Sequence, residues 1–229
     1  MVAGSGAPLR FVPPRADGLA YEERAYLHGE VETRAENRHD FFNALVWLAF
    51  PRTKTLLNRR HHAALVAARA RGDAARCALR DALTQFDECG VVVAGNRPGL
   101  WDALRAHRWR EVFVDRRAAL LESTRFFVFG HASHDQLGAP FVGLCGKAVF
   151  IEVADAWLEM PQGRGLAELD ARLADVLDAG DFAPRDWQPL PLLGIPGATA
   201  ENESASYYDD TRQFRPARRM PAGSPPGNR

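Results

Sequence analysis

The sequence predicts an α+β protein, namely a mostly helical single domain with a few short strands and an extended, proline-rich C-terminal arm. Two observations support this fold class. Segments with the composition and spacing of helices outnumber the short apolar runs that are typical of strands. From Pro184 onward, prolines interrupt regular structure, but the side chains between them are too apolar to remain in solvent. We therefore expect an ordered arm that lies on the domain.

The first elements surround a nearly continuous apolar segment. Residues 19–28 are expected to form a short helix and residues 30–34 a short strand. Residues 40–50 are almost all apolar, and their length favours a buried helix. Residues 44–50 alone also fit a strand, so both structures stay open for this part.

The clearest helix covers residues 51–71. Pro51 suits a first turn because it has no N–H to lose there, and Gly72 ends the pattern. The remaining elements are expected to be a short helix or turn at 81–88, a strand at 91–94, a helix at 98–107, a strand at 126–129, an apolar run at 149–153 and an amphipathic helix at 166–177.

The predicted domain organisation follows from composition. Residues 1–18 are expected to be a flexible N-terminal lead, and residues 19–215 a single globular domain that includes the arm. Residues 216–229 are rich in Arg, Pro, Gly and Ser, which is the composition of a disordered tail.

Charge and apolar content exclude several classes of protein. The chain has 29 basic and 29 acidic residues, so no global electrostatic attraction to nucleic acid is expected. No apolar run approaches the roughly 18 residues that a membrane span needs, and no secretory signal is evident. The spacing of Cys77, Cys89 and Cys145 suits neither a disulfide framework nor a metal knuckle. A cytoplasmic location with reduced thiols is therefore expected.

The main candidate site lies between residues 34 and 62. His39, Asp40 and Asn43 stand at a helix entrance, whereas Asn58 and His62 share a face of the next helix, four residues apart. This set has the ingredients of a hydrolytic site with a divalent metal. We expect catalytic roles for His39 and Asp40, with Asn58 and His62 among the metal ligands.

A structural role explains the same residues. Asp40 suits a helix cap, His39 can bond a loop carbonyl, and Asn43 can join two turns in the core. His61 and His62 follow two arginines, which is typical of a solvated basic face.

A second segment, LTQFDECG, contributes Asp87 and Glu88. Adjacent carboxylates on a helix point in different directions, so they form no catalytic pair by themselves. One of them can join a metal or orient His39, and we expect Asp87 to be the ligand. Cys89 has no activating partner in the sequence and is not expected to act as a nucleophile.

A third segment, FGHASHDQLG, places His131, His134 and Asp135 after a predicted strand. Two imidazoles and a carboxylate within one turn suit zinc or a His–Asp relay. A polar turn with internal hydrogen bonds is the alternative. His131 is expected to be the catalytic member.

Four residues are expected to bind substrate, namely Arg34, Asn43, Lys54 and Arg215. Arg215 belongs to the segment YYDDTRQFRPARR, whose arginines can hold a phosphate or an acidic partner. The alternative is that this segment packs on the domain through Tyr208 and Phe214, which accounts for the same residues without a ligand.

Two resemblances extend this interpretation. The order of His39, Asn58 and His62 is similar to that in His-Asn-His nucleases, which hold a catalytic His and one metal in a ββα unit. That resemblance covers residues 39–62 and implies a His39 base acting on a phosphodiester.

The second resemblance covers residues 21–219. The segments TRAENRHDFFNALVWLAFPRTKTLLN, RDALTQFDECG, FGHASHDQLGAP, WQPLPLLGIPG and YYDDTRQFRP, in this order, resemble the bacterial domain-of-unknown-function family 3025. This chain has Asp135 where the resemblance leads us to expect glutamate. The resemblance implies that these segments occur together in one family of proteins, but it implies no activity, substrate or cofactor.

The sequence leaves three functions open. The first is a metal-dependent hydrolase, acting on a phosphodiester, with His39 as the base that activates water. The second is a non-catalytic module that binds a small anion or a protein partner through an apolar groove and an arginine-rich rim. The third is a structural role in an assembly. The hydrolase hypothesis predicts that His39, His62 and His131 converge in one cleft. Asp87 and His131 are expected to form the wall opposite residues 34–62.

Overall fold

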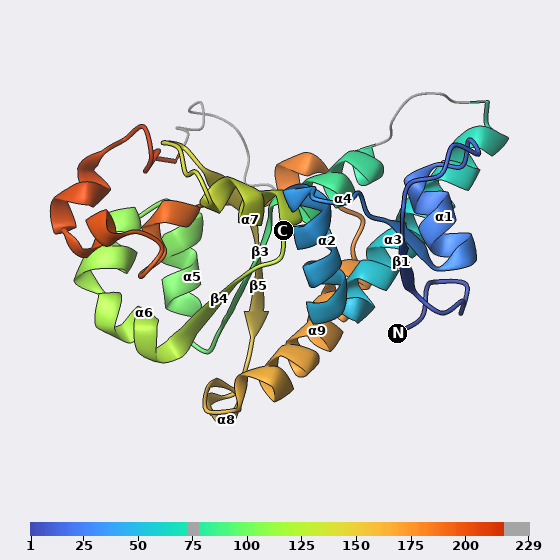
Figure 1. Ribbon diagram of the computed structural model, residues 1–229. Coiled ribbons are helices and arrows are strands. Elements are labelled where there is room, and N and C mark those ends of the chain that lie inside the picture. The colour runs from blue at the N-terminus through green and yellow to red at the C-terminus, as the bar shows by residue number, and fades with distance from the viewer. Residues whose placement is uncertain (73–77, 218–229) are drawn as a thin grey trace.

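The computed structural model describes residues 1–72 and 78–217, apart from the side chain of Gln162, and it confirms the predicted α+β class (Figure 1). The helices are α1 (Tyr21–His28), α2 (Arg38–Ala49), α3 (Pro51–Ala70), α4 (Ala78–Cys89), α5 (Pro98–Arg105), α6 (Arg117–Ser123), α7 (His131–Leu137), α8 (Asp155–Leu158) and α9 (Gln162–Ala179). The strands are β1 (Arg10–Val12), β2 (Glu30–Glu32), β3 (Gly90–Gly95), β4 (Thr124–Val128), β5 (Cys145–Glu152) and β6 (Gln188–Pro191). A π-helical turn covers Glu111–Asp115, and 3₁₀ turns occur at Pro184–Asp186, Leu192–Gly194, Ala200–Glu203 and Ala205–Asp209.

The core of the fold is a four-stranded sheet of order β4-β3-β5-β6. Strand β3 runs parallel to β5 and antiparallel to β4, and β6 closes the other edge antiparallel to β5. Every residue of β3 is buried. Because successive strand residues face opposite sides, Val91 and Val93 pack on one layer and Val92 and Ala94 on the other. The sheet is therefore covered on both faces.

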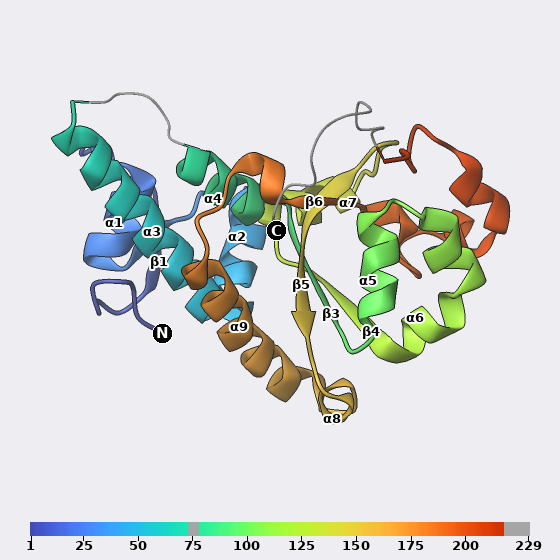
Figure 2. The same cartoon turned by 180° about the vertical axis from the view of Figure 1, so that it is seen from behind.

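The two covering layers come from different parts of the chain. Helices α5 and α6 and the C-terminal arm cover one face, whereas α4 and α9 cover the other (Figures 1 and 2). The predicted arm is confirmed, because β6 pairs with the sheet and Leu190, Tyr208 and Phe214 are buried in the core. The tail predicted at 216–229 lies outside the described residues from 218 onward.

A small second unit packs beside the sheet. Strands β1 and β2 pair in parallel, with Phe11 opposite Val31, and helix α1 connects them. A cluster of Ala25, Val31 and Trp47 attaches this unit to α2. The segment expected to be a flexible lead thus contains strand β1. The parallel pairing also contradicts the hairpin that a ββα nuclease unit requires.

Local signals decide most helix boundaries. Residues predicted as the apolar helix 40–50 form α2, so the alternative strand at 44–50 is wrong. Its N-cap is Asn37, whose side chain accepts a hydrogen bond from the backbone of Asp40; the expectation that Asp40 is the cap is therefore also wrong. Pro51 begins α3, and Gly72, with φ +65°, follows its end.

Two further elements differ from their expected form. Residues 81–88 lie within a full helix, α4, and the polar segment after β4 is helix α7 rather than a turn. Cys89 and Cys145 are free thiols, whereas Cys77 lies outside the described residues. None of the helices in the described ranges combines the length and hydropathy of a membrane span.

Candidate metal centre

A cavity of about 420 Å³ lies between α1, α2, α3, α4 and the start of α7. It collects all but two of the site residues predicted from the sequence. Those that line it are Arg34, His39, Asp40, Asn43, Lys54, Asn58, Asp87 and His131. His62 and Arg215 lie elsewhere.

A close contact between the segments 88–90 and 129–130 positions the wall made by α4 and α7. The backbone N–H groups of Phe129 and Gly130 both donate to the carbonyl of Gly90, at 2.9 and 2.8 Å. A Cβ atom on Gly130 would lie 2.4 Å from the Cα of Cys89, so only glycine permits this approach. The end of α4 and the start of α7 are therefore held side by side, which brings Glu88 close to His131.

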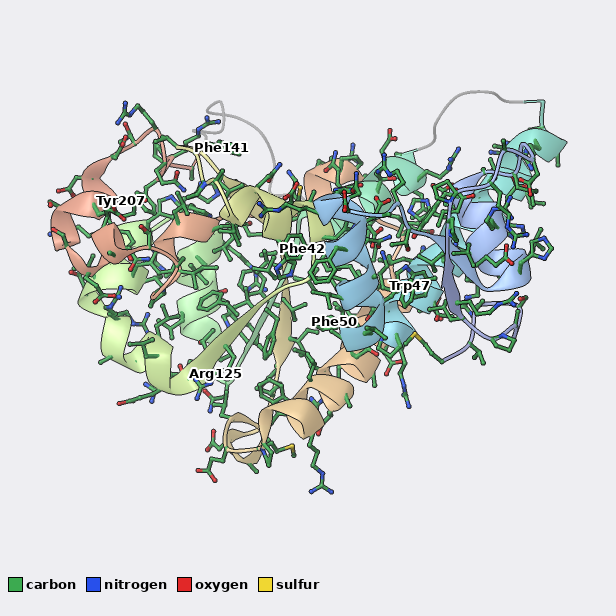
Figure 3. The ribbon with its side chains drawn as sticks, viewed as in Figure 1. Phe42, Trp47, Phe50, Arg125, Phe141 and Tyr207 are labelled. Atoms are coloured by element: carbon green, nitrogen blue, oxygen red, sulfur yellow. The ribbon has the colours of Figure 1, made fainter. Side chains whose placement is uncertain are left out.

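Helix α2 packs against α7 and carries the third member of the site. Arg38 forms an ion pair with Asp135 at 3.1 Å, and the ring of Phe42 stacks on that of His134. Phe42 and Trp47 project from opposite sides of α2, Phe42 toward α7 and Trp47 toward α1 and α3 (Figure 3). His39, in the first turn of α2, consequently meets the ring of His131 edge to face, with centroids 4.5 Å apart.

Three potential ligand atoms converge at this point. The Nε2 atom of His131 lies 3.1 Å from Nε2 of His39 and 3.4 Å from Oε2 of Glu88. His39 Nε2 and Glu88 Oε2 are 4.0 Å apart. His131 is buried, whereas His39 and Glu88 are each more than a third exposed, so the cluster lies at the edge of the protein interior.

These distances fit one metal ion. Ligands at about 2.0–2.1 Å from a tetrahedral zinc ion are separated by about 3.4 Å. Two imidazoles and one carboxylate form a donor set that zinc uses in catalytic sites, where a water molecule takes the fourth position. Among the described residues, His39, Glu88 and His131 are the group whose ligand atoms converge in this way.

The tautomer of His131 follows from its neighbours. Lys54 is 3% exposed, and its ammonium donates to Oδ1 of Asp87 at 2.6 Å. The other oxygen, Oδ2, lies 3.8 Å from Nδ1 of His131. At this distance the two atoms form an ion-pair contact without a hydrogen bond, and Nδ1 has no hydrogen-bond partner among the described residues. A proton on Nδ1 would face the Asp87 carboxylate and leave the lone pair of Nε2 directed at His39 and Glu88. The ligand role expected of Asp87 stays a prediction.

Asp87 stays ionised. Burial raises the pKa of its carboxyl, but the charge of Lys54 and the hydrogen bond from its ammonium lower the pKa, and the net shift is downward.

Lys54 also sets the direction of two hydrogen bonds on its other side, from Lys54 to Asn43 and from Asn43 to Tyr21. Because an ammonium only donates, Asn43 must accept with Oδ1, at 2.8 Å. The amide nitrogen of Asn43 then donates to the hydroxyl of Tyr21 at 2.9 Å. Burial raises the pKa of Tyr21, so the phenol keeps its proton. Tyr21 lines the cavity and retains its own O–H as a donor.

Asp40 has a positional role. Its carboxylate accepts from the guanidinium of Arg34 at both oxygens and from the backbone N–H of Arg34, each at 2.8 Å. The side-chain hydrogen bonds from Arg34 lower the pKa of Asp40 more than burial raises it. The pair fixes the loop before α2 and therefore the first turn that holds His39. Arg34 uses Nε and Nη2 in this pair, and its side chain is 59% exposed. The catalytic role expected of Asp40 and the substrate-binding role expected of Arg34 stay predictions.

Two predicted residues fall outside the cavity. The ring of His62 stacks on Tyr26, with centroids 4.1 Å apart. The backbone carbonyl of Arg215 accepts from Trp109 at 2.8 Å, in the layer on the other face of the sheet. Histidines 39 and 131 converge as predicted, but His62 does not join them.

Asn58 and His61 are buried and contribute polar atoms to the side of the cavity formed by α3. The amide nitrogen of Asn58 donates to the backbone carbonyl of Glu22 at 2.8 Å, which leaves Oδ1 as the free acceptor. Asn58 Oδ1 and His61 Nδ1 are both buried without a hydrogen-bond partner among the described residues. Asn58 thus lies in the cavity, and the ligand role expected of it stays a prediction.

Sequence reasoning missed Glu88 as a ligand and Tyr21, Glu22, Trp47 and His61 as cavity residues. For Glu88 a signal existed, since one carboxylate of the Asp87–Glu88 pair was expected to reach a metal. Choosing between them requires the rotation of α4 about its axis. That rotation is set by the burial of Phe86 and Leu83 in the core.

Comparisons with known proteins support a family but no activity. No curated protein and no solved structure gave a match to the chain. Residues 9–218 match the family described as "Protein of unknown function (DUF3025)". This match covers most of the chain and includes every residue of the cavity. The chain therefore belongs to the DUF3025 family.

Proposed function

We propose that the protein is a metal-dependent hydrolase in which His39, Glu88 and His131 hold one divalent transition metal ion. The observation that carries this proposal is the approach of His39 Nε2, His131 Nε2 and Glu88 Oε2 to within 4.0 Å of one another. At 3.1 Å, an Nε2–H of one imidazole can donate to the Nε2 of the other, so the two rings can share a proton when no metal is bound. A divalent metal ion at this point would replace that proton, take Glu88 as its third ligand and lower the pKa of a bound water.

The reaction consumes one water molecule. A metal ion held by His39, Glu88 and His131 would polarise this water. The oxygen of the water would form the new bond to the electrophilic atom of the substrate, the bond to the leaving group would break, and the leaving group would take up the proton that the water loses. In this scheme His39 is a metal ligand rather than a free base. The buried Lys54–Asp87 pair holds His131 in the tautomer that binds metal.

The charges around the cavity favour a carbonyl substrate over a phosphodiester. Recognition of a phosphate uses free cationic donors. The two cationic side chains that line the cavity each form an ion pair within the protein, Arg34 with Asp40 and Lys54 with Asp87, so a carboxylate already balances each charge. The hydroxyl of Tyr21, in contrast, is a neutral donor suited to a carbonyl oxygen that gains charge in the transition state. We therefore propose an ester or an amide as the bond that is cleaved.

The test compares two chromogenic substrates, p-nitrophenyl acetate and bis(p-nitrophenyl) phosphate, with protein loaded with zinc. The proposal predicts ester hydrolysis that a chelator abolishes, that zinc restores, and that His131→Ala lowers at least tenfold. The variant His62→Ala, outside the cavity, serves as the control and should retain full activity. Hydrolysis of the phosphodiester alone would overturn the preference for a carbonyl, and equal rates in wild type and His131→Ala would overturn the hydrolase.

A further inference from the structure

One carboxylate of the cavity belongs neither to the metal centre nor to an ion pair among the described residues. Five carboxylates line the cavity, Glu22, Glu32, Asp40, Asp87 and Glu88, against the two cationic side chains Arg34 and Lys54. Most of these carboxylates have a partner. Asp40 and Asp87 pair with the two cations, and Glu32 pairs with Arg24 at 3.0 Å. Glu88 belongs to the metal centre.

Glu22 is the exception. It is half-buried near the start of α1, and its carboxylate makes no ion pair or hydrogen bond with any described residue. A partly buried carboxylate without a partner is unfavourable, because it loses hydration and gains nothing in return. A bound cation would supply the missing interaction.

The neighbouring residues on α3 point to the same kind of ligand. Asn58 and His61 are 5% and 7% exposed, and each has a buried atom, Oδ1 and Nδ1 respectively, without a partner among the described residues. Hydrogen bonding of the Asn58 amide nitrogen to the Glu22 carbonyl fixes its oxygen as an acceptor. Burial lowers the pKa of His61, so its ring is neutral near pH 7 and has one nitrogen free to accept.

We propose that Glu22, Asn58 and His61 form a subsite for a positively charged, N–H-bearing group of the substrate, such as an amidinium, a guanidinium or an ammonium. The carboxylate would supply the charge and the amide oxygen and imidazole nitrogen would accept the N–H donors. Taking the bound molecule as the substrate rests on the proposed hydrolase. The subsite itself consists of residues from α1 and α3, whereas the metal centre consists of residues from α2, α4 and α7.

This arrangement gives the cavity two functions. Its volume of about 420 Å³ is that of a pocket for a small molecule. The cationic end of the substrate would lie against Glu22, Asn58 and His61. Its ester or amide bond would lie at the metal centre. The inferred substrate class is therefore a small, cationic ester or amide.

The experiment is calorimetric titration of benzamidine, benzamide and benzoate into the full-length protein, with and without zinc. Benzamidine and benzamide share a shape but differ in charge, and an amidinium is a poor metal ligand. We expect benzamidine to bind at least tenfold more tightly than benzamide, in the presence or absence of zinc. Benzoate should not bind to the zinc-free protein.

Matched variants assign the binding to the subsite. Glu22→Gln should weaken benzamidine at least tenfold, whereas Glu122→Gln, which removes one exposed carboxylate on α6, should not. Asn58→Asp adds a second carboxylate and should tighten benzamidine. Circular dichroism checks that each variant is folded.

The outcomes separate the two proposals. No benzamidine binding, equal binding of benzamide, or an unchanged affinity in Glu22→Gln overturns the subsite even if zinc binds normally. Normal benzamidine binding in a protein that binds no zinc supports the subsite and overturns the proposed hydrolase.

Discussion

The backbone N–H of Gly130 donates a hydrogen bond to the carbonyl of Gly90 at 2.8 Å, and this contact joins the residue before α7 to the residue after α4. Gly130→Ala would place a Cβ atom 2.4 Å from the backbone of Glu88 and Cys89. Because backbone atoms cannot turn aside, the two segments must separate. We expect a loss of about 1–3 kcal/mol in the free energy of unfolding and a weaker metal site.

Urea unfolding and zinc titration measure both effects. Gly99→Ala is the control, since the added methyl group meets no atom within 4 Å in helix α5. It should be neutral or slightly stabilising. Zinc affinity in Gly130→Ala equal to that of the wild type would show that this contact does not position Glu88 and His131.

Loss of the buried ammonium of Lys54 is expected to lower the free energy of unfolding strongly. Lys54→Met leaves the Asp87 carboxylate without its 2.6 Å partner and Asn43 Oδ1 without its donor. Removing one member of a buried pair costs about 3–5 kcal/mol. Urea unfolding should show this loss, and the double variant Lys54→Met/Asp87→Asn should recover part of it. A loss under about 1 kcal/mol would contradict the proposed network.

Asp87 is expected to act on the metal through His131. Asp87→Asn keeps the shape of the side chain but removes the charge that faces Nδ1 of His131 at 3.8 Å. Loss of such an orienting carboxylate lowers metal affinity about 10–100-fold. Zinc titration monitored with a competing chelator checks this value. Asp102→Asn is the control, because Asp102 is an exposed carboxylate on α5 that pairs with Arg105; it should leave zinc affinity unchanged.

Mild acid is expected to destabilise the protein through His61. Burial lowers the pKa of His61 below its ordinary value of 6.5, so the unfolded chain binds a proton that the folded chain does not. The free energy of unfolding therefore rises with pH between the lowered pKa and 6.5, and it falls as pH decreases through this window. Burial lowers the pKa of His134 as well, with the same sign.

Urea unfolding at several pH values tests this expectation. His61→Gln should flatten the dependence below pH 6.5, whereas His28→Gln, in an exposed position on α1, should leave it unchanged. An identical pH dependence in wild type and His61→Gln would refute the assignment.

Local features of the sequence predicted the long helices well. Pro51 begins α3 and Gly72 follows its end, and both signals come from the backbone of the residue itself and not from distant contacts. Strand β1 was missed because three residues next to prolines carry no such signal. Its pairing with β2 is stabilised instead by partners far along the chain, including Arg10 with Glu30.

The candidate site was predicted in outline but not in its roles. The residues between 34 and 62 together with Asp87 and His131 were expected to face one another, and most of them do. Their roles depend on geometry that spacing does not encode. His39 and His131 are 92 residues apart in sequence, and their contact depends on the packing of α2 on α7. The choice of Glu88 over Asp87 depends on how α4 is rotated against the core.

The most direct test of the metal centre is the zinc stoichiometry of the purified protein. After loading with zinc and extensive dialysis, elemental analysis should find one zinc ion per wild-type chain. His39→Ala, Glu88→Gln and His131→Ala should each lower the affinity at least tenfold in a titration, while His62→Ala should not. A wild-type protein that retains no zinc, or three ligand variants that bind it as tightly as the wild type, would contradict the account.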